Sequence, residues 1–144
     1  MNNIKLEIPC MSENEALARN IAAVFVALLD PTVEELTEIK TAVSEAVSNA
    51  ILHAYKDDRE GVIYIMMEAS DNGRVVITVE DKGVGIDDVQ KAREPLFTTG
   101  DSSERSGMGF TVMESFMDRV IVDSNPGKGT KVTLIKSLDH IDDF

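Results

Sequence analysis

The sequence predicts an α+β fold, a two-layer α/β sandwich in which helices cover a mixed, mostly antiparallel sheet. Two long helical patterns fill the chain between residues 12 and 54, and most of the strand-like segments follow them. Those later segments are joined mainly by short turns, so the strict alternation of strand and helix seen in parallel folds is missing. With 144 residues, 43% of them hydrophobic and 28% charged, the chain has the size and composition of one domain, which we place at residues 1–144.

A strand and a helix open the chain. Residues 4–8 alternate apolar and polar side chains, which is typical of a strand. Ser12 and Glu15 have the spacing of a capping box and predict that a helix begins there. The apolar residues that follow continue to about Leu29, where we expect this helix to end.

A second, longer helix follows directly. Asp30-Pro31 interrupts the first helix, because proline lacks the backbone N–H that a helix interior needs. Thr32 and Glu35 form another capping box, which predicts the start of the next helix. Apolar residues then recur at helical spacing, and the helix is predicted to run to about His53 or Ala54.

The second half of the chain has the pattern of two hairpins. Residues 62–69 and 74–80 are rich in β-branched side chains, and the Asn-Gly pair between them is a strong hairpin signal. Residues 120–124 and 131–137 form a second pair of predicted strands, which are joined by an Asn-Pro-Gly-Lys-Gly turn.

Between the hairpins the pattern is less regular. We predict a glycine-containing loop after Asp81, a short helix from about Asp87, and a mobile loop over residues 94–107. A helix is predicted from Gly109 to about Phe116. The polar residues at the C-terminus are expected to fray.

Charge and cysteine content narrow the classes of function. The chain carries 14 basic and 26 acidic residues, a net charge of −12, which disfavours direct binding to nucleic acid. The same charge also repels nucleotides, so a nucleotide site here would have to be built from nearby backbone N–H groups, a divalent cation and a few cationic side chains. Alternatively, the acidity could serve solubility alone. Cys10 is the single cysteine, and the sequence shows no signal peptide and no membrane-length apolar run, so we expect a cytoplasmic protein.

The long helix carries one group of polar residues with chemical potential. Glu45, Asn49 and His53 are spaced by four residues, so they line one face at the margin of the apolar stripe. They could simply form a solvated helix edge. Alternatively, Asn49 offers an oxygen ligand for a metal, and Glu45 offers a carboxylate that accepts a proton one turn away.

Three later segments could bind a ligand through backbone and polar groups. Asp81 follows a strand and could accept a hydrogen bond from an amine such as that of adenine, while Gly83 and Gly85 allow a tight turn. Glycines precede the helix that is predicted from Gly109, and the first N–H groups of that helix, which have no partner within it, could bind phosphates. Thr130 begins a strand and could bridge to a base. Each segment alone also fits an ordinary turn, hairpin or helix start.

The order of these motifs resembles the GHKL superfamily, whose members share the Bergerat ATP-binding fold. The resemblance covers residues 32 to about 135. It places the following residues in the conserved boxes of that superfamily: Asn49 in the N box, Asp81, Gly83 and Gly85 in the first glycine box, Gly107 and Gly109 in the second, and Thr130 in the last.

Two longer segments, residues 29–55 and 95–118, look like the family of sporulation anti-sigma F factors, with the stress-response anti-sigma kinases next in similarity. This resemblance implies a homodimer that sequesters an RNA polymerase sigma factor. It also implies a protein serine kinase that uses ATP and Mg²⁺ to phosphorylate an anti-anti-sigma factor. The edge strand 4–8 and the first helix, which carries Arg19, are candidates for the interaction surface.

The resemblance also suggests roles for the individual residues. Asn49 is expected to hold Mg²⁺, Glu45 to act as general base, and His53 to lie near the nucleotide. Arg105 is expected to contact the γ-phosphate or a partner. The phosphate cradle and its lid are expected to include Thr98, Thr99, Ser106, Gly107, Met108, Gly109 and Phe110.

Two functions of other kinds remain open from the sequence. The domain could be an interaction module that uses nucleotide only as a ligand, although such a module needs no carboxylate at Glu45. It could also be an ATPase that transfers phosphate to water.

Overall fold

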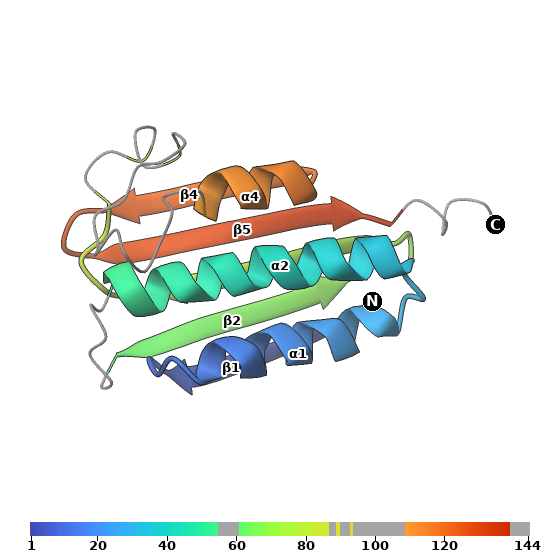
Figure 1. Ribbon diagram of the computed structural model, residues 1–144, viewed down its shortest axis with the longest axis horizontal. Helices are drawn as coiled ribbons and strands as arrows, with labels where there is room; N and C mark the ends of the chain where they lie inside the picture. The colour runs from blue at the N-terminus through green and yellow to red at the C-terminus, as the bar shows by residue number, and fades with distance from the viewer. Residues whose placement is uncertain (55–60, 87–88, 90–92, 94–108, 139–144) are drawn as a thin grey trace.

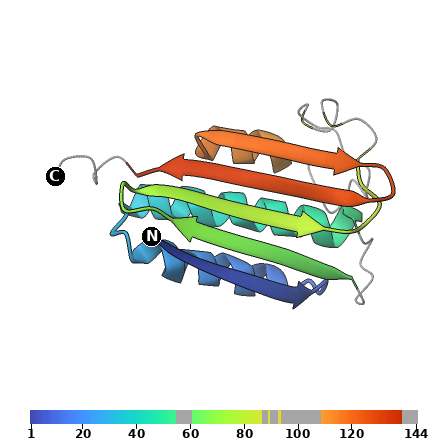
Figure 2. The same ribbon diagram turned by 180° about the vertical axis from the view of Figure 1, so that it is seen from behind.

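The computed structural model describes residues 1–54, 61–86, 89, 93 and 109–138. Within these residues a five-stranded sheet is covered on one face by helices (Figure 1; Figure 2 shows the opposite side). The elements, in chain order, are β1 (Asn2–Pro9), α1 (Asn14–Ala27), α2 (Val33–Asn49), the π-helical turn η1 (Ala50–Ala54), β2 (Val62–Ala69), β3 (Arg74–Asp81), α4 (Gly109–Phe116), β4 (Arg119–Asn125) and β5 (Gly129–Ser137).

The strand order is β1-β2-β3-β5-β4, and all four pairings in the described part of the chain are antiparallel. The predicted α+β sandwich is confirmed, with a sheet that is antiparallel throughout rather than mixed. Helix α2 lies between α1 and α4 and packs against both (Figure 1). It is therefore the central element of the helical layer.

The core forms between the helices and the facing side of the sheet. Along β2 every second residue is buried, as expected for a strand with one covered face. Helix α2 buries Ile39, Ala42, Val43, Ala46 and Val47, which recur at helical spacing. Among the described residues, no helix has both the length and the apolar character needed to cross a bilayer.

The predicted capping box at the start of α1 is wrong. The N-cap residue is Glu13, and no side chain caps this end of the helix. The Glu15 carboxylate instead accepts a hydrogen bond from the Ser44 hydroxyl of α2 and faces Arg19 at 3.4 Å. A contact between two helices has replaced the local contact that the sequence suggested.

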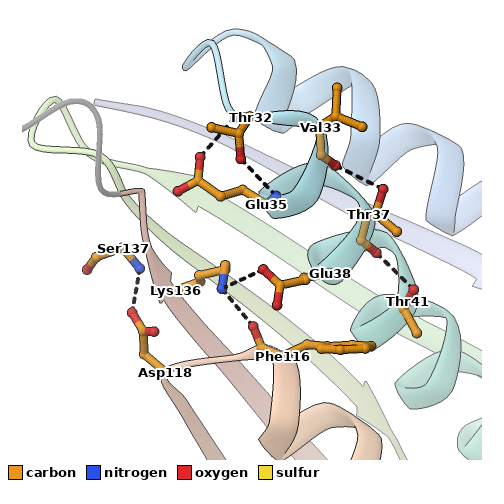
Figure 3. A network of polar contacts seen from close by, with 10 residues as sticks. All are labelled: Thr32, Val33, Glu35, Thr37, Glu38, Thr41, Phe116, Asp118, Lys136 and Ser137. Atoms are coloured by element: carbon orange, nitrogen blue, oxygen red, sulfur yellow. Dashed lines mark hydrogen bonds and ion pairs between the residues drawn. The ribbon is translucent and has the colours of Figure 1, made fainter.

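The capping box at the start of α2 is confirmed. The backbone N–H of Glu35 donates to Thr32 Oγ1 at 3.0 Å, and the N–H of Thr32 donates to Glu35 Oε1 at 2.9 Å (Figure 3). Such a box contributes about 1 kcal/mol to a helix. The helical conformation continues through η1 to Ala54, as predicted, although the last turn is π-helical.

The end of the sheet near the α2 N-terminus is fixed by a nearly buried lysine. Lys136 of β5 donates from Nζ to the Phe116 carbonyl at 2.8 Å and lies 3.4 Å from Glu38 Oε1 (Figure 3). Nearby, the N–H of Ser137 donates to Asp118 Oδ2 at 2.8 Å. These contacts join β5, the end of α4 and the N-terminal half of α2, and so help to fix the position of α4 along the sheet.

The hairpins and α4 agree with the sequence prediction. The β2–β3 turn is closed by hydrogen bonds from Ser70 N to Arg74 O and from Gly73 N to Ser70 O. Helix α4 begins and ends at the predicted residues, Gly109 and Phe116. The short helix predicted from Asp87 lies largely outside the described residues, and the predicted loop 94–107 lies wholly outside them.

Candidate functional site

Polar side chains gather at one end of the helix-facing side of the sheet. Asp81, at the end of β3, pairs with Thr130 at the start of β5, and Thr130 pairs in turn with Ser124 of β4. Paired residues point to the same face of a sheet, so the three side chains form one row. The C-terminal end of α2 and the N-terminal end of α4 lie at this same end of the molecule (Figure 1).

Asp81 is the charged residue of this row, and it is buried, with 6% of its surface exposed. Its Oδ1 accepts hydrogen bonds from the backbone N–H groups of Gly83 at 3.0 Å and Thr130 at 3.2 Å. Within the described part of the chain, no hydrogen bond reaches Oδ2. A buried carboxylate oxygen without a donor is costly, and a ligand with an N–H group would satisfy it.

Burial raises the pKa of the Asp81 carboxyl above its ordinary value. The hydrogen bonds from Gly83 and Thr130 act in the opposite direction and lower the pKa, while the charge of Glu80 raises it further. The local environment therefore disfavours the ionised form of a residue that is well placed to bind a donor. Carboxyl groups with a shifted pKa are common in binding and catalytic sites.

Two glycines let the β4–β5 turn pack closely against the end of β3. Gly85 has φ +76°, and a Cβ there would lie 2.1 Å from the Asn125 carbonyl oxygen. Gly129 has φ +107°, and a Cβ there would lie 2.1 Å from the Asp81 carbonyl oxygen. Gly83 is not among the described glycines with positive φ, and its contribution is the N–H that it donates to Asp81.

The Thr130 hydroxyl lies 2.8 Å from Ser124 Oγ. Ser124 Oγ also accepts from the N–H of Ile86 at 2.8 Å and lies 3.1 Å from the Gly129 carbonyl oxygen. Ser124 was not among the residues predicted from the sequence. A serine one strand before a Gly-Thr pair gives no local signal, because its partner Ile86 is 38 residues away.

Glu45 and Asn49 lie in the last part of α2, one turn apart, and both are half-buried. Their spacing places them on the same side of the helix, as the sequence predicted. The π-helical turn η1 begins at the next residue, and such turns are frequent at functional sites. The backbone of His53 belongs to η1, while its side chain lies outside the described part.

Helix α4 presents its N-terminal end, starting at Gly109, toward the same region. The Phe110 side chain is buried in the core, so a ligand could use only its backbone N–H. The other predicted cradle and lid residues lie outside the described residues, namely Thr98, Thr99, Arg105, Ser106, Gly107 and Met108.

Arg93, which was also not predicted from the sequence, lies just before residues 94–108. Its Nε donates to Glu114 Oε1 of α4 at 2.6 Å, and its Nη2 donates to the Val120 carbonyl of β4 at 3.0 Å. Arg93 therefore ties the chain that leads toward the predicted cradle to two fixed elements.

No group of three or more histidine, cysteine or acidic side chains able to hold a metal ion occurs among the described residues. A single amide oxygen at Asn49 suits a Mg²⁺ ion that keeps most of its ligands from phosphates and water. Asn49 could therefore supply one ligand to an ion that arrives with a nucleotide.

Two buried acceptors, Asp81 and Thr130, lie at this end of the sheet. The N-terminus of α4 and the Asn49 amide at the end of α2 belong to the same end. These are the groups needed to bind, in turn, an exocyclic amine, phosphates and a divalent cation. Residues 9–136 match the family described as histidine kinase-like ATPase domain. The chain is therefore a domain of this nucleotide-binding class.

Within that class the chain belongs to the anti-sigma F factor family. It is 55% identical over 137 residues to the anti-sigma F factor of Geobacillus sp. (strain WCH70) and 53% identical to that of Bacillus subtilis (strain 168), in each case over 95% of this chain and 93% of the relative. The anti-sigma F factor of Pasteuria penetrans is 54% identical, over 95% of this chain and 91% of that protein.

Solved structures with low sequence identity show the same fold. The structure of the RsbU and RsbW domains of Rv1364c from Mycobacterium tuberculosis aligns with a TM-score of 0.70 at 19% identity, over 96% of this chain and 33% of that chain. The histidine kinase domain of the Erythrobacter litoralis EL346 blue-light activated histidine kinase aligns with a TM-score of 0.59 at 23% identity, over 94% of this chain and 64% of that chain.

Proposed function

We propose that this chain is an anti-sigma factor that sequesters an RNA polymerase sigma factor of the sporulation type. We also propose that it is an ATP-dependent protein serine kinase that phosphorylates its anti-anti-sigma antagonist. The observation that carries the proposal is that the paired residues Asp81 and Thr130 lie at the same end of the sheet as the C-terminal end of α2, which finishes at Asn49, and the N-terminal end of α4 (Figure 1). Two relatives with over half of the residues identical, from Geobacillus sp. (strain WCH70) and Bacillus subtilis (strain 168), are named anti-sigma F factors.

In the proposed complex, the adenine amine donates to the Asp81 carboxylate, and Thr130 lies beside the same base. The N–H groups from Ser106 to Phe110 would hold the phosphates, and Asn49 would supply one oxygen to Mg²⁺. Bound Mg-ATP supplies the transferable γ-phosphoryl group. These positions are consistent with Asp81 Oδ2, which no hydrogen bond from the described residues reaches, and with the direction in which α4 points.

For phosphotransfer, the serine hydroxyl oxygen of the substrate bonds to the γ-phosphorus while the bond to the β–γ bridging oxygen breaks, releasing ADP. Glu45 accepts the hydroxyl proton as general base. Arg105 steadies the γ-phosphate or contacts the partner. Thr98 and Thr99 belong to a lid that responds to the γ-phosphate, which gives ATP and ADP complexes different surfaces.

We further propose that residues 1–144 act as one cytoplasmic domain and assemble as a homodimer through β1 and α1. β1 is an edge strand, and α1 exposes Val24 beside the cap residue Leu28. Arg19, in contact with Glu15 on the same helix, is a candidate for partner contact. The net charge of −12 agrees with a protein that binds other proteins rather than nucleic acid.

The decisive experiment combines binding and transfer. Asn49→Ala should lose the Mg²⁺-dependent part of ATP affinity in calorimetry, while an Asn49 variant with unchanged affinity would remove the metal role. Labelled ATP is then incubated with the chain and a purified anti-anti-sigma protein from the same organism. Phosphoserine on that protein supports the kinase, free phosphate indicates an ATPase, and neither product indicates a binding module.

A further inference from the structure

Ser124 lies where three segments meet: the end of β4, the start of β5 and the loop after β3. Its hydroxyl is within hydrogen-bond distance of Ile86 N, Gly129 O and Thr130 Oγ1, at 2.8, 3.1 and 2.8 Å. Nothing in the proposed reaction requires a hydroxyl at this position. The three contacts nevertheless restrict the directions of the Ser124 and Thr130 hydroxyl hydrogens, next to the candidate base site formed by Asp81 and Thr130.

The hydrogens can be assigned by counting donors and acceptors. The Ile86 N–H can only donate, so Ser124 Oγ accepts from it. The Gly129 carbonyl oxygen can only accept, so Ser124 must use its single hydrogen there. Thr130 must then donate its own hydroxyl hydrogen to Ser124 Oγ. This is the only arrangement that forms all three hydrogen bonds at once.

This arrangement fixes what Thr130 can offer to a ligand. With its hydrogen directed to Ser124, the Thr130 hydroxyl presents only lone pairs to the site beside it. Its neighbour Asp81, when ionised, likewise presents only lone pairs. Two adjacent acceptors match an exocyclic amino group, which has two N–H donors, and oppose a carbonyl oxygen at the same place.

We propose that Ser124 is a positioning residue that sets the hydrogen-bond direction of the Thr130 hydroxyl, and thereby makes the site select a 6-aminopurine over a 6-oxopurine. The inference rests on the proposed function, because it concerns the same nucleotide. Ser124 acts through Thr130 and need not touch the ligand. It works together with Asp81, which contributes the buried acceptor.

The test is the ratio of affinities for ADP and IDP, measured by calorimetry with Mg²⁺. These nucleotides differ at the base, where the amino group of adenine is replaced by a carbonyl in hypoxanthine. Ser124→Ala frees the Thr130 hydrogen, so the hydroxyl can turn and donate to a carbonyl. We expect the preference for ADP to fall by about tenfold, the usual effect of one misdirected hydrogen bond. Ser124→Thr keeps a hydroxyl and should restore the preference.

A double-mutant cycle shows whether Ser124 acts through Thr130. Thr130→Val removes the hydroxyl that Ser124 orients. Adding Ser124→Ala to Thr130→Val should leave the ADP-to-IDP ratio within about twofold of the single Thr130 variant. Independent, additive losses from the two changes would overturn the proposal.

Hydrogen exchange gives a readout that needs no ligand. The Ile86 amide should lose protection in Ser124→Ala and keep it in Ser124→Thr. If Ser124→Ala does not fold, Ser124→Cys replaces it, since a thiol is similar in size but a much weaker donor and acceptor. Unchanged exchange at Ile86 would contradict the hydrogen-bond assignment.

The outcomes separate this inference from the proposed function. If the wild-type protein binds ADP and prefers it over IDP, but Ser124→Ala leaves that ratio unchanged, the role of Ser124 is wrong and the kinase proposal stands. If the folded wild-type protein binds neither nucleotide, both proposals fail together.

Discussion

The backbone N–H of Thr130 donates to Oδ1 of Asp81 at 3.2 Å, across the β3–β5 pair and 49 residues apart in the sequence. This bond holds the Asp81 carboxylate in one orientation. Gly83 also donates to Oδ1, so within the described residues the second oxygen accepts no hydrogen bond and could accept one from a ligand. The same contact joins the two residues of the candidate base site, Asp81 at the end of β3 and Thr130 at the start of β5.

Asp81→Asn should weaken nucleotide binding while increasing stability at neutral pH. Asparagine keeps an oxygen for the two backbone donors but places an amide where the proposed adenine amine binds, so ADP affinity should fall by about tenfold or more. The buried charge disappears, which should raise the urea midpoint. Calorimetry and urea unfolding at pH 7 check the two effects.

The stability gain should depend on pH in a defined direction. The folded pKa of Asp81 lies above its ordinary value of 3.8, so the folded protein binds the proton more readily than the unfolded chain. The resulting stabilisation is complete below the unfolded pKa and is lost as the pH rises through the folded pKa. The difference between Asp81→Asn and wild type should therefore grow from acidic to neutral pH. A constant difference would contradict the raised pKa.

Gly85→Ala and Gly129→Ala should each destabilise the fold strongly, by roughly 3 kcal/mol or more, because the added Cβ overlaps a backbone carbonyl oxygen and φ is positive. Gly127 is a matched control, since its φ is +77° but no atom lies within 4 Å of the added Cβ. Gly127→Ala should cost only about 1 kcal/mol. Urea unfolding measures the stability of the three variants. Equal losses of stability would show that the cost comes from the positive φ alone and not from the overlap with the carbonyl oxygen.

Glu45→Gln should separate binding from phosphotransfer. The amide cannot accept the serine proton, so kcat should fall by about 10²–10⁴-fold, while ADP affinity stays within about twofold. Glu34, exposed in the first turn of the same helix, supplies the control: Glu34→Gln should alter neither quantity. Full phosphotransfer by the Glu45 variant would exclude this residue as the general base.

Removing Glu38 should cost more stability than removing its partner Lys136. Glu38→Ala leaves the nearly buried Lys136 ammonium with only the Phe116 carbonyl as a partner among the described residues (Figure 3), a loss of about 1–3 kcal/mol. Lys136→Met removes the charge and keeps the apolar length, so its cost should be smaller. Urea midpoints of both variants, with Glu34→Ala as control, show which change costs more stability. A larger loss in Lys136→Met would contradict the prediction.

Most of the elements could be predicted from the sequence because their signals are local. The capping box of Thr32 and Glu35, the Asn-Gly hairpin and the bounds of α4 each depend on residues a few positions apart. The long-helix spacing of Glu45 and Asn49 is local in the same sense. The α+β class follows from the order of these elements.

The sequence by itself therefore determined which segments are helices and strands, the family resemblance and the residues proposed to act. The tertiary structure alone decided that Glu15 contacts Ser44 instead of capping α1, that β5 lies between β3 and β4, and that Ser124 meets Ile86. The physical reason is the range of the interactions. Helix and turn signals act over about four residues, whereas these contacts join groups 29 and 38 residues apart and form only when the whole core packs.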